Sequence, residues 1–245
     1  MVKLNERIHF ILNGEHVAAD ASPGLLALDY LRQERHLVGT KSGCKEGDCG
    51  ACSVILGELQ EDGSVSYRPM TSCLLPMGEL HGKHLVSIEG LNMEQLSPVQ
   101  SAMVDCGGTQ CGYCTPGFVV CMTAGLMAPQ IPLNEEGMLY AISGNLCRCT
   151  GYRSIKEAGL RSIDSLRDQL AGKERIAALV EAGALPEYFT KVADWLKALQ
   201  PQTPAEPVSF ADRQIIAGGT DLYVQRGELL PEQSVELLNN QSPIK

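Results

Sequence analysis

Four of the ten cysteines, Cys44, Cys49, Cys52 and Cys73, have the spacing C-x4-C-x2-C followed at a distance by a fourth thiol. This spacing is typical of plant-type [2Fe–2S] sites, in which four thiolates hold the cluster. The first three lie in the string S-G-C-K-E-G-D-C-G-A-C-S-V, residues 42–54, whose glycines let the backbone wrap closely and adopt positive φ. Backbone N–H groups that point at the sulfurs would offset the negative charge of such a site. The pattern therefore favours an iron–sulfur cluster.

Zinc is the alternative metal for this loop. Structural zinc sites usually pair thiols as C-x2–4-C and add a second pair of thiols or two histidines. This loop has one close pair of thiols, an outlying Cys44 and no histidine. The spacing thus indicates iron–sulfur chemistry more strongly than zinc.

A second set of four cysteines lies further along the chain, as C-x2-C in C-G-Y-C-T-P-G-F and as C-x-C in N-L-C-R-C-T-G-Y-R. Its members are Cys111, Cys114, Cys147 and Cys149. The C-x2-C pair alone is also found in redox dithiols and in zinc sites. Each pair is expected to lie just before a helix, so the thiolates of two loops would face one another near helix N-termini, which favour anions. This arrangement suits a second negatively charged cluster.

Two further cysteines, Cys106 and Cys121, are interpreted as core or structural residues rather than ligands. Buried free cysteine is common and inert, and Cys121 lies on the apolar face of a predicted helix.

The bulk composition limits the kinds of partner. The chain has 245 residues, a net charge of −9 and a pI near 5.1, so we expect neither nucleic acid nor an anionic membrane as its main partner. Its longest apolar stretch, residues 118–127, is too short to span a bilayer, and the N-terminus has no apolar core of a signal peptide. We therefore expect a cytoplasmic protein, where grouped thiols more often hold metal than form disulfides.

Two kinds of element must position these cysteines. Around the first set the sequence predicts a small mixed sheet with one helix opening at Ser22-Pro23-Gly24 and a hairpin turn at Asn13-Gly14. The predicted strands are residues 8–13, 16–19, 53–56, 64–68 and 85–88.

Around the second set, N-capping residues followed by proline or acidic residues predict a bundle of four helices. These are residues 99–104, 117–127, 134–144 and 154–170.

The later chain is predicted to be helical from residue 171 to residue 199. A linker with three prolines, residues 197–209, follows, and a β-like segment, residues 215–222, carries the string A-G-G-T-D-L.

Taken together, the strings S-G-C-K-E-G-D-C-G-A-C-S-V, Q-C-G-Y-C-T-P-G-F and G-N-L-C-R-C-T-G-Y-R resemble the iron–sulfur part of the molybdenum hydroxylases, over residues 5–170. That family includes xanthine dehydrogenases, aldehyde oxidoreductases and carbon monoxide dehydrogenases. The string M-V-D-C-G-G-T-Q-C-G-Y-C and the linker before A-G-G-T-D-L are most similar to the small iron–sulfur subunit of the bacterial xanthine dehydrogenase type.

The resemblance implies an α+β chain of four parts. These are a β-grasp [2Fe–2S] ferredoxin domain (1–90), an all-α four-helix [2Fe–2S]-binding bundle (91–170), a helical segment with a proline-rich linker (171–209) and the N-terminal fragment of a FAD-binding domain (210–245). It implies that Cys44, Cys49, Cys52 and Cys73 hold one cluster, and that Cys111, Cys114, Cys147 and Cys149 hold the other.

Two cofactor contacts are also implied. Gln110 matches a glutamine that hydrogen-bonds the pterin of a molybdopterin cofactor in a separate large subunit; an exposed loop residue is the alternative. Ala217, Gly218, Gly219, Thr220 and Asp221 match the first pyrophosphate-binding loop of the FAD domain, where glycines suit a backbone N–H cradle for phosphate; an ordinary turn is the alternative. The rest of that domain is not in the sequence, so we expect either a truncated chain or a second chain that completes it, and no stable binding of FAD by this chain alone.

In the family, a carbon is hydroxylated at molybdenum and two electrons pass through both clusters and FAD to NAD+. The implied role of this chain is electron transfer without a catalytic residue of its own, with hypoxanthine or xanthine as the expected substrate. The alternatives are another hydroxylase of the family, acting on an aldehyde, nicotinate, an aryl-CoA or carbon monoxide, and, outside that function, a zinc-binding scaffold or an inactive remnant of a split gene.

Overall fold

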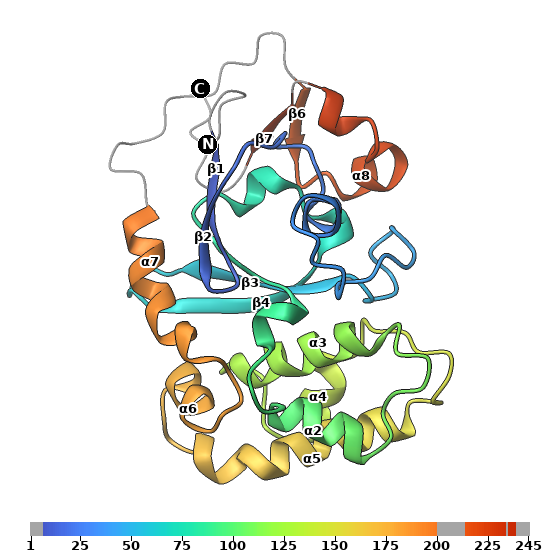
Figure 1. Ribbon diagram of the computed structural model, residues 1–245, viewed down its shortest axis with the longest axis vertical. Helices are drawn as coiled ribbons and strands as arrows, with labels where there is room; N and C mark the ends of the chain where they lie inside the picture. The colour runs from blue at the N-terminus through green and yellow to red at the C-terminus, as the bar shows by residue number, and fades with distance from the viewer. Residues whose placement is uncertain (1–6, 200–213, 234, 239–245) are drawn as a thin grey trace.

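The computed structural model describes residues 7–199, 214–233 and 235–238. In Figure 1 the strands β3 (Ser53–Leu59) and β4 (Val65–Thr71) cross the middle of the molecule, with a layer of helices below them and the N-terminal strands of the same sheet and the C-terminal segment above.

Five strands form one mixed sheet in the order β2-β1-β5-β3-β4. They are β1 (Ile8–Leu12), β2 (Glu15–Ala19), β3 (Ser53–Leu59), β4 (Val65–Thr71) and β5 (His84–Val86). β1 is antiparallel to β2 and parallel to β5, whereas β3 is antiparallel to both β4 and β5. The predicted strands are confirmed with one correction: Ile88 lies in a 3₁₀ turn (Ile88–Leu91), because the chain leaves the sheet after Val86.

The predicted turn at Asn13-Gly14 joins β1 to β2. Asn13 adopts a left-handed backbone (φ 55°), which asparagine tolerates better than most residues. Its side-chain oxygen accepts a hydrogen bond of 2.9 Å from the backbone N–H of Ser87, just after β5. The hairpin is thereby fixed to the central strand of the sheet.

The predicted helix after Gly24 is short. One α-helical turn, α1 (Ala27–Asp29), continues as a wider π-helical turn (Tyr30–Glu34). Leu28 and Leu31 are buried, and Leu31 packs in the core beneath β1 and β3. The element therefore covers one face of the sheet, as its apolar spacing predicts.

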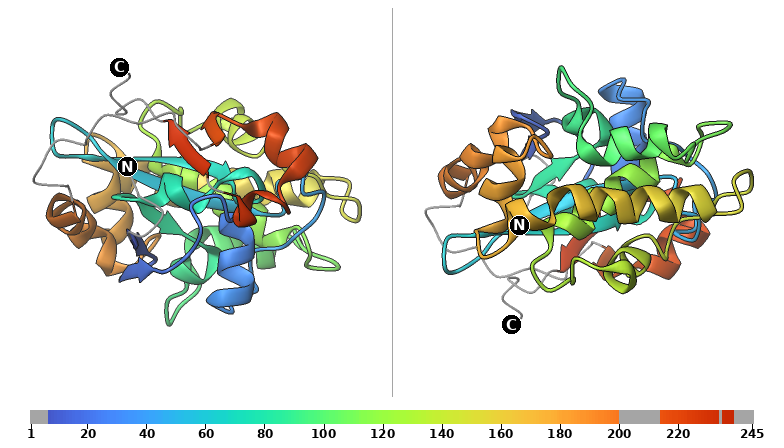
Figure 2. Two further views of the ribbon diagram at one scale, coloured as in Figure 1. Left: turned by 90° about the horizontal axis from the view of Figure 1, so that it is seen from above. Right: turned by 90° about the horizontal axis from the view of Figure 1, so that it is seen from below.

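Four helices cover the opposite face of the sheet near β3 and β4 (Figure 1). They are α2 (Pro98–Asp105), α3 (Thr115–Met127), α4 (Glu135–Ala141) and α5 (Arg153–Leu170). α3 is buried along almost its whole length, and its Phe118 shares a core with Ile55 and Tyr67 of the sheet. Figure 2 shows α5 running across the outer side of this layer. An apolar helix buried between a sheet and other helices holds its ends in fixed positions.

The helix starts follow their predicted signals with one correction. Ser97 caps α2 with a reciprocal capping box, in which its hydroxyl accepts from the Gln100 N–H and its own N–H donates to the Gln100 side chain. At α3 the N-cap is Cys114 rather than Thr115. The Thr115 hydroxyl instead pairs with that of Thr109 at 2.7 Å, so it is not available to cap the helix.

Two more helices follow, α6 (Arg175–Glu181) and α7 (Val192–Leu199). The three prolines of the predicted linker lie outside the described residues, and Lys197 to Leu199 belong to α7 rather than to a linker.

The C-terminal segment is a strand–helix–strand unit with β6 (Gln214–Ala217), α8 (Thr220–Arg226) and β7 (Val235–Leu238), in which β6 and β7 are parallel. The β-like segment predicted for residues 215–222 is therefore partly wrong, since Thr220 to Leu222 are helical. Tyr223 and Leu230 pack in a small core that Leu26 and Leu74 also contact. The segment thus lies against the part of the sheet domain that carries Cys73. Within the described ranges, no helix combines the length and apolar character needed to cross a bilayer.

Candidate metal centres

Strand register brings two cysteines of the first set together. Cys52 directly precedes β3 and Cys73 follows β4, and the register pairs Ser53 with Thr71. The backbone N–H and the hydroxyl of Ser72 both donate to the carbonyl oxygen of Cys52, at 3.2 and 2.7 Å. The sulfur atoms of Cys52 and Cys73 are therefore 3.3 Å apart and buried.

The other two cysteines of this set lie in a loop rich in N–H donors. The Glu46 N–H donates to the Cys44 sulfur at 3.3 Å, and the Cys44 N–H donates to the Cys49 sulfur at 3.4 Å. Burial alone would raise the pKa of Cys44, but backbone N–H groups of Glu46, Asp48 and Cys49 outweigh it and lower the pKa. Donors aimed at the sulfurs stabilise thiolate, the form that binds metal.

Glycines make room for this loop, as the sequence predicts. A side chain on Gly43 would place its Cβ 2.6 Å from the Cys49 sulfur. Gly47 has φ +82°, and a Cβ there would lie 2.6 Å from Leu74. The loop can hold its thiols at this spacing only with glycine at these positions.

The second set is built from two loops that precede helices. Cys114 caps α3, and Cys147 and Cys149 lie in the loop that ends at α5. The sulfurs of Cys111 and Cys149 are 3.6 Å apart, and the thiols of Cys114 and Cys147 interact as a second pair.

Backbone and hydroxyl donors also surround the second set. A backbone hydrogen bond from Tyr113 is the main cause of a lowered pKa at Cys111. At Cys147, burial would raise the pKa, but the hydroxyl and N–H of Thr150 and the N–H of Cys149 lower it. The Cys147 N–H donates to the Tyr152 hydroxyl at 2.9 Å, which ties this loop to the start of α5.

Both sets are arranged as two pairs of thiols. In the first set the thiols of Cys44 and Cys49 interact as the second pair, beside Cys52 and Cys73. Two thiolates on one tetrahedral metal with bonds near 2.3 Å lie about 3.8 Å apart, close to the two measured sulfur separations. Among the described residues, no group of three or more His, Cys, Asp or Glu side chains could hold a single metal ion. A tetrahedral zinc site needs four ligands around one ion, whereas a [2Fe–2S] cluster takes two ligands on each of two irons. Two pairs of thiols in each set match the ligand pattern of a two-iron cluster.

The remaining predicted residues take different places. Gln110 is exposed beside Cys111. Cys121 is buried within α3, as predicted for a core residue, and Cys106 ends α2 and packs against the helical core.

The predicted flavin loop forms the turn between β6 and α8. Gly218 and Gly219 have φ +74° and +72°, and Thr220 and Asp221 begin the helix. Ala217 ends β6. The chain therefore makes a strand–glycine–helix turn there, which requires glycine at both positions.

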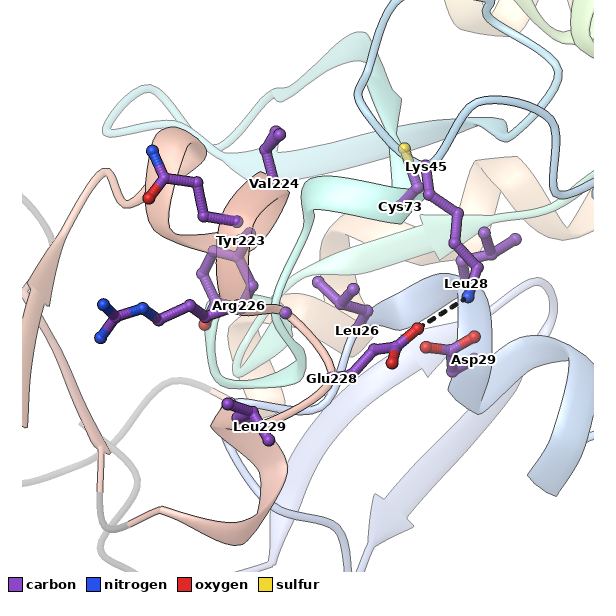
Figure 3. Close-up of a pocket in the computed structure, with 12 residues that line it drawn as sticks. Leu26, Leu28, Asp29, Lys45, Cys73, Tyr223, Val224, Arg226, Glu228 and Leu229 are labelled. Carbon is purple, nitrogen blue, oxygen red and sulfur yellow. Dashed lines mark ion pairs between the residues drawn. The ribbon is translucent and has the colours of Figure 1, made fainter.

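A cavity of about 410 Å³ lies between α8 and the first cysteine set (Figure 3). Cys73 and Lys45 contribute to one side, and Tyr223 and Glu228 to the other. Lys45 Nζ lies 3.6 Å from a Glu228 carboxylate oxygen, an exposed pair that contributes little stability.

Sequence reasoning did not single out the residues that connect the two sets. Tyr113, Asn145 and Leu146 bridge the loops, and Tyr152 holds the second. All four stand inside or beside the cysteine strings, but their residue types alone do not indicate this role.

Comparison with known protein families shows which class of protein this chain belongs to. Residues 10–77 match the 2Fe-2S iron-sulfur cluster binding domain family, and residues 87–160 match the [2Fe-2S] binding domain family. The chain is thus an iron–sulfur protein with two [2Fe–2S]-binding domains of mixed α and β content.

Individual relatives give the family. Aldehyde oxidase 4 of Cavia porcellus is 40% identical over 159 residues, and xanthine dehydrogenase 1 of Arabidopsis thaliana is 38% identical over 159 residues. These matches cover 63% and 64% of this chain, which spans 12% of the length of each relative. The structure of quinoline 2-oxidoreductase from Pseudomonas putida 86 is 32% identical with a TM-score of 0.54, and the match covers 66% of this chain and 96% of that chain. The chain belongs to the molybdenum hydroxylase family and is an iron–sulfur part of such oxidoreductases.

Proposed function

We propose that this chain is the electron-transfer subunit of a molybdenum hydroxylase in the cytoplasm. It would carry electrons from a molybdopterin site in a large partner subunit towards FAD and NAD+. The observation that carries the proposal is the presence of two cysteine sets, each of two thiol pairs, whose loops are hydrogen-bonded to one another.

In this proposal Cys44, Cys49, Cys52 and Cys73 hold one [2Fe–2S] cluster, and Cys111, Cys114, Cys147 and Cys149 hold the other. When bound, these clusters supply one-electron redox chemistry. The chain contributes the thiolates, the N–H donors that offset their charge, and the packing that fixes their positions.

Exposure supports the direction of the path. Cys111 and Cys149 are exposed, and so is Gln110 beside them, whereas Cys52 and Cys73 are buried against Leu28 and Leu74. A partner subunit could therefore reach the second set directly. We place the molybdopterin subunit there, with Gln110 as the pterin contact.

The flavin is placed at the other end of the chain. The two glycines before Thr220 suit a phosphate, and the unit that carries them packs beside Cys73. We propose the four parts 1–90, 91–170, 171–209 and 210–245, of which the first is a β-grasp domain, the second a four-helix bundle and the last a fragment of a FAD domain that another chain would complete.

The proposed substrate is a purine, hypoxanthine or xanthine. The A-G-G-T-D-L segment after the linker supports it. An aldehyde is the second candidate, because an aldehyde oxidase and a xanthine dehydrogenase match this chain at 40% and 38% identity.

The experiment is anaerobic co-purification of the tagged chain from its own source, followed by molybdenum analysis and addition of substrate. Recovery of molybdenum with a larger subunit, and bleaching of the iron–sulfur absorbance by hypoxanthine but not by an aldehyde, is the expected result. Bleaching by aldehyde alone would overturn the purine assignment. Recovery of an iron-containing chain without molybdenum would overturn the assignment to a hydroxylase.

A further inference from the structure

Three hydrogen bonds connect the loops of the two cysteine sets. The Leu146 N–H donates to the Cys49 carbonyl oxygen at 3.0 Å, and the Asn145 side-chain NH₂ donates to the Gly50 carbonyl oxygen at 3.1 Å. On the outside, the Tyr113 hydroxyl donates to the Ser42 carbonyl oxygen at 2.6 Å. The donors lie beside cysteines of the second set, and the acceptors lie in the loop of the first.

The two loops also approach closely at Gly50 and Gly117. Gly50 has φ +68°, and a Cβ there would overlap the Asn145 amide and lie 2.7 Å from the Gly144 carbonyl oxygen. A Cβ on Gly117, in the first turn of α3, would overlap the Gly50 carbonyl. Because neither glycine can take a side chain without moving the neighbouring loop, the separation of the loops is tightly set.

Asn145 is the buried member of the connection. It is 4% exposed, whereas Tyr113 is 48% exposed. Its amide NH₂ is bonded to Gly50, but its side-chain oxygen has no partner among the described residues. The Asn145 side chain also contacts the thiol of Cys121 in α3, so it lies between the loop of the first set and the helix that follows Cys114.

Leu146 connects the two cysteine sets through the backbone. Leu146 is covalently joined to Cys147, and Cys49 is itself a member of the first set. A single C=O···H–N bond therefore links the backbone of one set to that of the other. The Asn145 side chain binds the carbonyl oxygen of Gly50, the residue after Cys49. This bond keeps Leu146 aligned with Cys49.

We propose that Asn145 is a positioning residue that locks the two cysteine loops together and so fixes the distance between the two sets. The proposal rests on the proposed function of both sets as [2Fe–2S] sites. It assigns Asn145 no direct contact with a cluster.

The test compares the full chain with Asn145→Ala, Asn145→Ser and a matched control, Asn134→Ala. Asn134 caps α4 through a 2.9 Å bond from the Gly137 N–H and lies outside the connection. All proteins are purified anaerobically, and two quantities are measured. The first is hydrogen–deuterium exchange of the peptide that carries Leu146; the second is the broadening that each reduced cluster causes in the EPR signal of the other.

Loss of the Asn145 bond should speed exchange at Leu146 by about tenfold, the factor expected for one hydrogen bond. The EPR broadening should decrease at unchanged iron content, and Asn134→Ala should change neither quantity. Unchanged exchange and broadening in both Asn145 variants would overturn the proposal. So would an unfolded Asn145→Ser protein, because the residue would then serve general stability. Failure of the proposed function is distinguishable, since the unsubstituted chain would then lack iron and both EPR signals.

Discussion

The sulfur atoms of Cys52 and Cys73 lie 3.3 Å apart although the residues are 21 positions apart in sequence. The hairpin of β3 and β4 causes this closeness, because its register places Cys52, directly before β3, opposite Ser72, and Cys73 follows Ser72 in the turn after β4. Cys111 and Cys149 repeat the arrangement across two helical loops, with sulfurs 3.6 Å apart. One set is therefore fixed by a sheet and the other by helix starts, so the sets should be separable by mutation.

The first prediction concerns that separation. Cys147→Ser should remove one [2Fe–2S] EPR signal and keep the other, because a neutral serine hydroxyl is a much weaker ligand for cluster iron than a thiolate. Cys73→Ser should remove only the other signal. Cys106→Ser is the control and should keep both. Retention of both signals in Cys147→Ser would show that Cys147 is not a ligand.

The second prediction concerns the glycine at φ +82°. Gly47→Val should destabilise the first loop by about 2 kcal/mol or more from backbone strain alone, and its side chain would also press on Leu74. The visible and EPR spectra of the first cluster should change, and those of the second should not. Gly107→Val is the matched control, since Gly107 has φ +62° but no atom within 4 Å of an added Cβ. A first-cluster spectrum in Gly47→Val that equals that of the control would refute this account of the loop.

The third prediction concerns pH and the buried His84. Its Nε2 lies 2.8 Å from the Asn13 carbonyl oxygen, which can only accept, so Nε2 carries the proton and Nδ1 accepts from the Tyr67 hydroxyl at 3.1 Å. Burial lowers the pKa of His84 to about 4. The unfolded chain therefore binds the extra proton first, and stability is lost as the pH falls from 6.5 towards 4.

Between pH 7 and pH 5 this difference in pKa corresponds to a loss of about 2 kcal/mol in the free energy of unfolding. Urea unfolding followed by circular dichroism at both pH values measures it. His84→Gln should be less stable at pH 7 but should show a smaller loss between the two pH values. An equal loss in both proteins would mean that His84 does not titrate on unfolding.

Much of the site could be predicted from sequence because its information is local. Cysteine spacing, the glycines of the first loop and the Ser97-Pro98 cap each act over a few residues, and all take the predicted places. The pairing of thiols could not be predicted, since it depends on the β3–β4 register and on the packing of α3. The Asn145 connection was missed for the same reason: its partner, Gly50, is 95 positions away.

Local residue preferences also gave wrong helix and strand boundaries where tertiary packing determines them. Thr115-Pro116 is a good helix start, but Thr115 pairs with Thr109 and Cys114 takes the cap. The string A-G-G-T-D-L reads as part of a strand, but two glycines at positive φ end β6 at Ala217 and start α8. Thr220, the first residue of α8, is β-branched, so its residue type alone does not predict that a helix begins there.

The role of both cysteine sets depends on the metal that they bind. The decisive measurement is metal analysis of the anaerobically purified chain together with EPR spectra of its reduced form. We predict about four iron atoms per chain, no stoichiometric zinc and two distinct [2Fe–2S] signals. A colourless protein that contains zinc and gives no EPR signal would contradict this prediction.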